Sequence, residues 1–124
     1  MEPRASPMSM DVPKIACQGV WKVFGPDPER CVRTLKGSPS AGAPSGHVAA
    51  VRDVSVAVRA NEVFVVMGLS GSGKSTLVRC MARLVEPTAG SIVVDGRNLL
   101  AMAPRELTEF RRRRMAMVFQ HFAL

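Results

Sequence analysis

A run of glycines, hydroxyl residues and one lysine near the middle of the chain has the composition and spacing of a phosphate-binding loop. Residues 68–76 read Gly-Leu-Ser-Gly-Ser-Gly-Lys-Ser-Thr and contain the complete pattern G-x-x-x-x-G-K-[ST]. Glycines let consecutive backbone N–H groups turn toward one ligand. In such a loop Lys74 reaches the β- and γ-phosphates, and the Ser75 hydroxyl binds Mg²⁺. The predicted ligands of the phosphates and the magnesium ion are Gly68, Leu69, Ser70, Gly71, Ser72, Gly73, Lys74, Ser75 and Thr76.

The segments on either side of this loop have the patterns needed to position it. Residues 63–67 form a short apolar run rich in β-branched residues, which predicts a strand buried on both faces, as in a parallel sheet. After the loop, apolar residues recur at helical spacing, at Leu77, Val78, Met81, Ala82 and Val85. A helix that begins at the loop directs the positive end of its dipole toward bound phosphates. A strand, a glycine loop and a helix therefore follow in the required order, and an ordinary glycine-rich turn would not require Lys74 and Ser75.

Further strands are predicted from apolar patterns elsewhere in the chain. Residues 15–24 are largely apolar and end before a glycine, and residues 54–58 alternate between valine and other residues. Residues 91–95 predict a strand that stops at an Asp-Gly turn, so Asp95 is interpreted as a turn residue and not as a magnesium ligand. Residues 115–119 predict a last apolar strand.

The remaining segments predict a leader, an insertion and one more helix. Residues 1–14 contain three prolines and are expected to form a disordered leader, so the folded part is residues 15–124. Residues 25–47 are rich in proline, glycine and serine and predict a loop insertion with one short helical turn near residues 29–35. Pro104 suits the first turn of a helix, in which Glu109 and Arg113 form a favourable pair.

The composition restricts the class of protein. The chain has 124 residues, 47% of them hydrophobic, and a net charge of +7, which suits one modest domain. A basic balance fits nucleic acid, an anionic membrane surface or nucleotide phosphates, and the loop favours nucleotide phosphates. The three cysteines show no C-x-x-C pair and are expected to be reduced thiols. No run of 18 apolar residues and no secretory signal is found, so any membrane role is expected to act through a partner.

These motifs together resemble one protein family. GLSGSGKST, with VFVVM before it and LVRCMARLVEPTAG after it, resembles the ATP-binding subunit of ABC transporters, and RRRRMAMVFQHFAL resembles the approach to the Q-loop of that family. With VWKVFGPDPER, VRDVSV and the long segment after Gly25, residues 15–124 are similar to the ATPase subunits of glycine betaine/proline (quaternary amine) importers. The resemblance implies an α/β fold of the P-loop NTPase (ABC) type. This chain would supply its N-terminal part, with antiparallel β-subdomain strands and the P-loop strand–helix unit, and would end before the helical subdomain.

The resemblance also implies roles for two residues outside the loop. Phe24 falls where the family places an aromatic ring that stacks on adenine. The alternatives are that Phe24 is an ordinary core residue, or that Trp21 stacks on adenine in its place. Gln120 matches the Q-loop glutamine, which contacts Mg²⁺ or the attacking water, and the alternative is a solvated loop residue. Gln120 and Lys74 are thus the candidate catalytic residues, Ser75 and Gln120 the candidate magnesium ligands, and ATP and Mg²⁺ the implied cofactors.

The family pattern continues past Leu124, which leads us to expect a truncated chain or a fragment of a longer subunit. The LSGGQ-type signature, the acidic strand that holds Mg²⁺, the catalytic glutamate and the switch histidine have no counterpart in residues 1–124. Phosphoryl transfer needs Mg²⁺, a positioned water and charge stabilisation together. The family consists of ATPases that couple ATP hydrolysis to transport, whereas these residues alone leave the enzymatic activity of this chain open.

The implied function is that of an ATP-binding subunit on the cytoplasmic face of the cell membrane. Its implied partners are permease subunits, a substrate-binding protein and a second ATPase subunit, and not nucleic acid. The alternative is a non-catalytic fragment that binds nucleotide or pairs with intact subunits without turnover. Another P-loop enzyme, such as a small-molecule kinase, is disfavoured because no lid or acceptor-site motif is found. The four arginines at 111–114 are expected to form a solvated helix end, with a nucleic-acid or phospholipid contact as the alternative.

Overall fold

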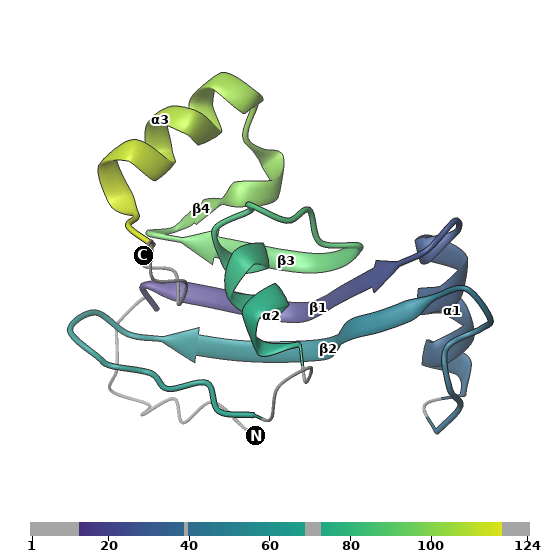
Figure 1. Ribbon diagram of the computed structural model, residues 1–124. Helices are drawn as coiled ribbons and strands as arrows, with labels where there is room; N and C mark the ends of the chain where they lie inside the picture. The colour runs from purple at the N-terminus through teal and green to yellow at the C-terminus, as the bar shows by residue number, and fades with distance from the viewer. Residues whose placement is uncertain (1–12, 39, 69–72, 118–124) are drawn as a thin grey trace, which may run out of the picture.

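The fold is built on one antiparallel sheet with helices around it (Figure 1). The computed structural model describes residues 13–38, 40–68 and 73–117. The strand order is β2-β1-β3-β4, with β1 at Ile15–Phe24, β2 at Val48–Val58, β3 at Ala89–Val94 and β4 at Arg97–Asn98. The helices are α1 at Pro28–Gly37, α2 at Lys74–Met81, the 3-10 helix η1 at Leu99–Ala101 and α3 at Pro104–Arg114. The strands predicted at 15–24, 54–58 and 91–95 and the helix at Pro104 are confirmed, although β2 and β3 begin earlier than predicted. The helix after the loop is also confirmed, but it ends at Met81, so Ala82 and Val85, which were expected on its apolar face, lie at or beyond its end. The short strand β4 was not predicted.

The central strand β1 carries a bulge that turns its side chains toward two different cores. Gly19 has a φ of +57°, and the register of β1 against β2 shifts between Cys17 and Val20. A bulge inserts one extra residue into a strand, so Cys17 and Val20 face the same core although they lie three positions apart. Trp21 and Val23 face a second core instead.

The main core lies between the sheet, α2, η1 and α3. Its buried members are Cys17, Val20, Val51, Leu77, Cys80, Ile92, Val94, Leu99, Met102, Leu107 and Phe110. Leu77 and Cys80 on α2, like Leu107 and Phe110 on α3, are three positions apart, so each helix buries one stripe of apolar side chains. Figure 1 shows α2 lying across the face of the sheet. The core thereby fixes the helix that begins at Lys74.

Residues 25–47 contain a helix of ten residues, α1, where the sequence predicted a loop with one short helical turn. The Asp27 side chain caps this helix by accepting from the Arg30 N–H at 3.3 Å, and Pro28 occupies its first turn. The buried members of the second core are Trp21, Val23, Cys31, Val32 and Leu35. A helix this short depends on packing for its stability. The prolines and glycines around α1 favoured the prediction of a loop. The helix is stabilised because its three apolar residues pack with two buried residues of β1.

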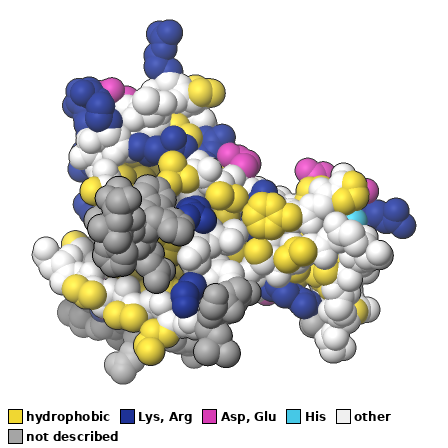
Figure 2. Space-filling view, viewed as in Figure 1, with side chains coloured by type: hydrophobic (Ala, Val, Ile, Leu, Met, Phe, Trp, Pro, Cys, Tyr) yellow, Lys and Arg dark blue, Asp and Glu magenta, His cyan; other side chains and the backbone are white. Residues whose placement is uncertain are grey.

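Residues 63–67 do not form the buried strand that their apolar run predicted. They lie outside the sheet and run below β2 in Figure 1, and Figure 2 shows hydrophobic side chains exposed along this lower edge. Val63 is 89% exposed and Met67 is 86% exposed. A parallel strand needs a hydrogen-bonded neighbour and cover on both faces, and none of the described strands pairs with this segment. Residues 115–117 are likewise irregular where a strand was predicted, and residues 118–119 lie outside the described part.

Two arginines connect the end of α2 to η1 and α3. The Arg111 guanidinium donates to the carbonyls of Ala82 at 3.0 Å and Arg83 at 2.7 Å. The Arg83 guanidinium in turn donates to the carbonyls of Leu99 at 2.9 Å and Met102 at 3.0 Å. Carbonyls at a helix C-terminus lack intrahelical partners, and cationic side chains satisfy them well. Arg111 therefore has a structural role that the expectation of a solvated arginine run did not include.

The other three arginines of that run carry ion pairs, and Lys and Arg side chains gather around α3 in Figure 2. Arg112 and Arg113 pair with Glu109 at 2.7 and 2.8 Å, which confirms the predicted pair between residues 109 and 113. Arg114 lies 3.6 Å from Asp95. Asp95 has a φ of +51° in the turn between β3 and β4, as the Asp-Gly pattern predicted.

Burial in the main core holds the Cys17 thiol in its neutral form. Burial, and to a smaller extent the nearby Cys80, raise the pKa of Cys17 from 9.0 to about 11, because a thiolate loses its hydration inside the core. The unfolded chain therefore releases this proton above pH 9, whereas the folded chain keeps it. The free energy of unfolding consequently falls as the pH rises from 9 to about 11.

We expect the stability of the wild type to fall, relative to a Cys17→Ala variant, by up to about 1.4 kcal/mol per pH unit in this range. Urea unfolding of both chains at several pH values, followed by the fluorescence of the single tryptophan, measures the difference. Parallel stability curves for the two chains would contradict the assignment of a neutral buried thiol.

All three cysteines are free and buried, as the predicted reduced state requires.

Candidate phosphate-binding site

The last glycine of the loop begins α2 without a capping side chain from the described residues. Gly73 is the N-cap residue, with a left-handed backbone at φ 90° and ψ 2° and no side-chain cap hydrogen bond. By contrast, the Asp27 side chain caps α1. The first N–H groups of a helix have no intrahelical acceptor, and together with the helix dipole they favour a bound anion. The start of α2 therefore presents donors that a phosphate could accept.

A side chain at residue 73 would collide with the sheet. A Cβ added to Gly73 would lie 1.9 Å from the carbonyl oxygen of Ala50, which belongs to β2. The start of α2 is thus held directly against β2. Glycine at this position is required by packing as well as by the phosphate-binding pattern.

The Lys74 side chain reaches back to the first residue of the motif. Its Nζ donates to the carbonyl oxygen of Gly68, so the first and the last parts of the motif are in contact. Ser75 is exposed at the start of α2, and Thr76 beside it is half-buried. The predicted ligands that lie outside the described residues are Leu69, Ser70, Gly71 and Ser72. The described part of the loop therefore brings together one cation, one hydroxyl and open N–H groups.

Phe24 ends β1 with a ring that remains available to a ligand. The residue is 46% exposed, and the Nζ of Lys22 lies 4.9 Å from the ring centroid. Trp21, the alternative aromatic residue, is only 4% exposed and packs in the second core against α1. A buried indole cannot stack on a base, so Phe24 is the better candidate of the two.

Two residues beside Phe24 were not among the predicted site residues. Lys22 could have been found from its spacing, since residues two apart on a strand share a face. His47 approaches from the far end of the insertion, and a Cβ added to Gly25 would lie 2.4 Å from its Cδ2. Its Nε2 accepts from the Asp27 N–H at 3.1 Å, which fixes the turn after Phe24. No local pattern signals such a contact, because it depends on how the insertion folds.

The described residues offer few groups for a metal ion. Over residues 13–38, 40–68 and 73–117, no three His, Cys, Asp or Glu side chains cluster in a way that could hold one. Of the two predicted magnesium ligands, Ser75 is exposed beside the loop, and Gln120 lies outside the described part. Nor does this part contain a helix long and apolar enough to cross a membrane.

Comparisons with known sequences identify the family of the chain. The protein-family profile described as ABC transporter matches residues 51–124. The trimethylamine N-oxide transport system ATP-binding protein TmoW of Ruegeria pomeroyi is 50% identical over 117 residues, which cover 93% of this chain and 34% of that protein. The glycine betaine/proline betaine transport system ATP-binding protein ProV of Escherichia coli is 42% identical over 114 residues, covering 90% of this chain and 28% of that protein. The chain thus spans about a third of the length of these relatives.

The fold is similar to that of solved ATP-binding cassettes. A dimeric post-hydrolysis state of the ATP-binding cassette MJ0796 bound to ADP and Pi matches with a TM-score of 0.67 and 26% identity, covering 89% of this chain and 40% of that one. A second dimeric structure of MJ0796, a bacterial ABC transporter cassette, matches with a TM-score of 0.61. The similarity extends over most of this chain and less than half of the cassette.

Proposed function

The chain belongs to the ABC transporter family, and we propose that it forms the nucleotide-binding part of the ATP-binding subunit of an importer for glycine betaine/proline-type quaternary amines. The relatives named for trimethylamine N-oxide and for glycine betaine/proline betaine match over 117 and 114 residues. The methionine import ATP-binding protein MetN of Desulfitobacterium hafniense matches over only 77 residues. The longer matches, to proteins named for betaines and for an amine N-oxide, support betaine-type quaternary amines and closely related methylated amines as the substrate class.

The observation that carries the proposal is the start of α2. Gly73 holds the left-handed N-cap position, no side chain among the described residues caps the helix, and Lys74 reaches back to the other end of the motif. The helix α1 gains from its Asp27 cap, whereas α2 and α3 begin without one, and of these two only α2 follows the complete motif. The uncapped start, preceded by the complete motif, suits an external anion as the cap.

The described residues would act mainly by binding and orienting the nucleotide. Mg²⁺ bound to ATP neutralises charge on the phosphates and activates the terminal phosphoryl group for transfer to water. Phe24 would stack on adenine, the loop N–H groups and Lys74 would hold the phosphates, and Ser75 would bind Mg²⁺. Gln120 would position the water or the magnesium ion. Holding these groups in place lowers the entropic part of the barrier.

The activity of the whole subunit is also part of this proposal. Residues 15–124 would form the N-terminal part of an ABC ATP-binding domain that couples ATP hydrolysis to import. Its partners would be a second ATP-binding subunit, permease subunits and a substrate-binding protein, and it would lie on the cytoplasmic face of the membrane. The dimeric state of MJ0796 in both similar structures supports pairing between ATP-binding subunits.

Lys74→Ala is the direct test of the nucleotide site. We expect it to weaken Mg·ATP binding by about tenfold or more, because a charge-assisted hydrogen bond contributes about 1.5–3 kcal/mol. Calorimetry, or displacement of a fluorescent ATP analogue from the full chain, measures the dissociation constant.

Arg105→Ala is the matched control for the Lys74 variant. It also removes one positive charge, but from an exposed position on α3, and we expect binding within about twofold of the wild type because a distant exposed charge is screened. Equal weakening in both variants would indicate general attraction to the basic chain. Wild-type binding no tighter than that of the Lys74 variant would refute the proposed site.

A further inference from the structure

Lys22 projects from the same face of β1 as Phe24. The neighbouring residues Trp21 and Val23 are buried in the second core. Alternate residues of a strand point to opposite faces, so Lys22 and Phe24 project away from that core. The 4.9 Å between the Lys22 Nζ and the Phe24 ring centroid agrees with this arrangement. The ammonium therefore lies beside the ring that is assigned to adenine.

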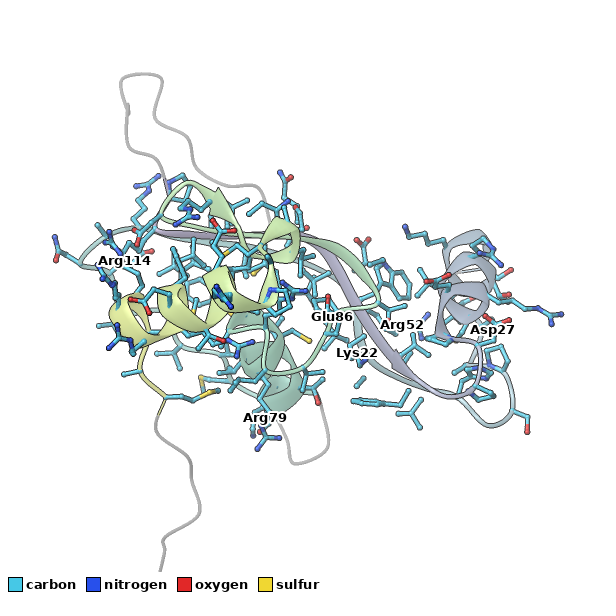
Figure 3. All side chains as sticks on the ribbon, turned by 90° about the horizontal axis from the view of Figure 1, so that it is seen from above. Lys22, Asp27, Arg52, Arg79, Glu86 and Arg114 are labelled. Atoms are coloured by element: carbon cyan, nitrogen blue, oxygen red, sulfur yellow. The ribbon has the colours of Figure 1, made fainter. Side chains whose placement is uncertain are left out.

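The same lysine lies close to the start of α2. Lys22 pairs with Val51 of β2, the residue after Ala50, and the Ala50 carbonyl is the group that approaches Gly73. Val20, two positions before Lys22 on β1, is buried in the main core with Leu77 and Cys80 of α2, so strand alternation places Lys22 on the face of the sheet that α2 covers. Figure 3 shows Lys22 on the stretch of β1 between α2 and α1. Lys22 thus lies between the adenine ring site and the phosphate loop.

The charge of Lys22 has no carboxylate partner in the described part of the chain. None of the ion pairs found there includes it, and its contact is with the Phe24 ring. Lys22 is half-buried, so its aliphatic stem packs while its ammonium stays accessible. A charge-assisted hydrogen bond to a phosphate oxygen is stronger than a cation–π contact at a partly exposed site. An anion between the ring and the loop would therefore draw the ammonium toward it.

We propose that Lys22 is a further nucleotide-binding residue, which binds the phosphate group next to the ribose. In a nucleotide the base is followed by the ribose, the α-phosphate and then the β- and γ-phosphates. Phe24 is assigned to the base and Lys74 to the β- and γ-phosphates, so a cation placed between them meets the α-phosphate. This inference rests on the proposed function, because it needs the nucleotide to occupy the site.

The test compares ligands that differ in their phosphates. The dissociation constants of ATP, ADP, AMP and adenosine are measured for the wild type, Lys22→Gln, Lys22→Arg, Lys74→Ala and Phe24→Ala. Lys22→Gln is expected to weaken ATP, ADP and AMP by about fivefold to tenfold and to leave adenosine unchanged. Lys22→Arg keeps the charge and should retain most of the affinity. Lys74→Ala should weaken ATP and leave AMP nearly unchanged, and Phe24→Ala should weaken all four ligands.

Two results would overturn the assignment of Lys22. Equal weakening of AMP and adenosine by Lys22→Gln would mean that the lysine acts only through the Phe24 ring. Unchanged binding of AMP and ATP would mean that it takes no part in the site. If Lys74→Ala weakens ATP in that second case, the failure is confined to Lys22. If Lys74→Ala binds ATP like the wild type, the proposed function fails and the inference about Lys22 fails with it.

Discussion

Gly90→Ala is expected to lower the free energy of unfolding by about 3–5 kcal/mol. Gly90 has a φ of +101°, a region that residues with a Cβ rarely adopt. An added Cβ would lie 2.5 Å from the carbonyl oxygen of Gly19 and 2.7 Å from the Cα of Val20. These are backbone atoms of the central strand, so no side chain can move aside to make room. Relief would require the bulge of β1 to shift, which would displace the fully buried Val20 from the main core.

Substitutions at two other glycines distinguish backbone strain from steric collision as causes of the lower free energy of unfolding. Gly96 has a φ of +75° but no atom within 4 Å of an added Cβ, so Gly96→Ala measures the backbone strain alone, at about 1–2 kcal/mol. Gly42 has neither feature, and Gly42→Ala should change stability by less than about 0.5 kcal/mol. Urea unfolding followed by tryptophan fluorescence measures all three. A Gly90 variant no less stable than the Gly96 variant would show that β3 does not approach the bulge so closely.

Three strands of the antiparallel sheet could be predicted because each carries its own signal, whereas the two-residue strand β4 was not predicted. β1 is largely apolar, β2 alternates, and β3 ends at the turn that contains Asp95. The start of α3 could likewise be predicted from Pro104, which is suited to the first turn of a helix. These signals are local, since backbone preferences and turn residues act within a few positions of the chain.

The wrong predictions of secondary structure concern segments whose conformation depends on which other elements pack against them. Residues 63–67 have the composition of a buried strand, but a strand needs a partner, and the described strands do not provide one. The helix α1 is the opposite case, because its composition suggested a loop, and its apolar residues are buried in one cluster with Trp21 and Val23 of β1. A hydrophobic pattern shows that a segment has apolar side chains to bury. It does not show whether another part of the chain packs against them.

Only part of the candidate site could be predicted from the sequence. The motif predicted the roles of Gly68 and Lys74 in one loop, and the structure brings these two residues into contact. The choice between Phe24 and Trp21 could not be made from residue type, since both are aromatic and lie on one strand. It depends on which residues α1 covers, and the structure shows that α1 covers Trp21.

Gly73→Ala is expected to weaken ATP binding by at least tenfold and to destabilise the fold at the same time. The residue has a φ of +90°, and an added Cβ would lie 1.9 Å from the Ala50 carbonyl oxygen and 3.0 Å from its carbonyl carbon. Because both are backbone atoms of β2, the start of α2 would have to move away from the sheet. Lys74 and Ser75 would move with it, and a displacement of about 1 Å is enough to lose a site of this kind.

The combination of the two losses distinguishes this variant from Lys74→Ala. Lys74 contributes a side chain to the ligand and little to the core, so its replacement should weaken binding and leave stability within about 0.5 kcal/mol. Gly46→Ala provides the control for strain, since Gly46 has a φ of +82° and no atom within 4 Å of an added Cβ. Calorimetric ATP binding and urea unfolding of the three variants give the comparison. A Gly73 variant that loses binding but keeps wild-type stability would mean that the glycine serves the ligand alone, and the contact between α2 and Ala50 would then be wrong. Loss of both binding and stability would show that the sheet positions the phosphate site. Gly73 then serves two purposes, because it begins the helix at the phosphate-binding loop and also lets that helix pack against β2.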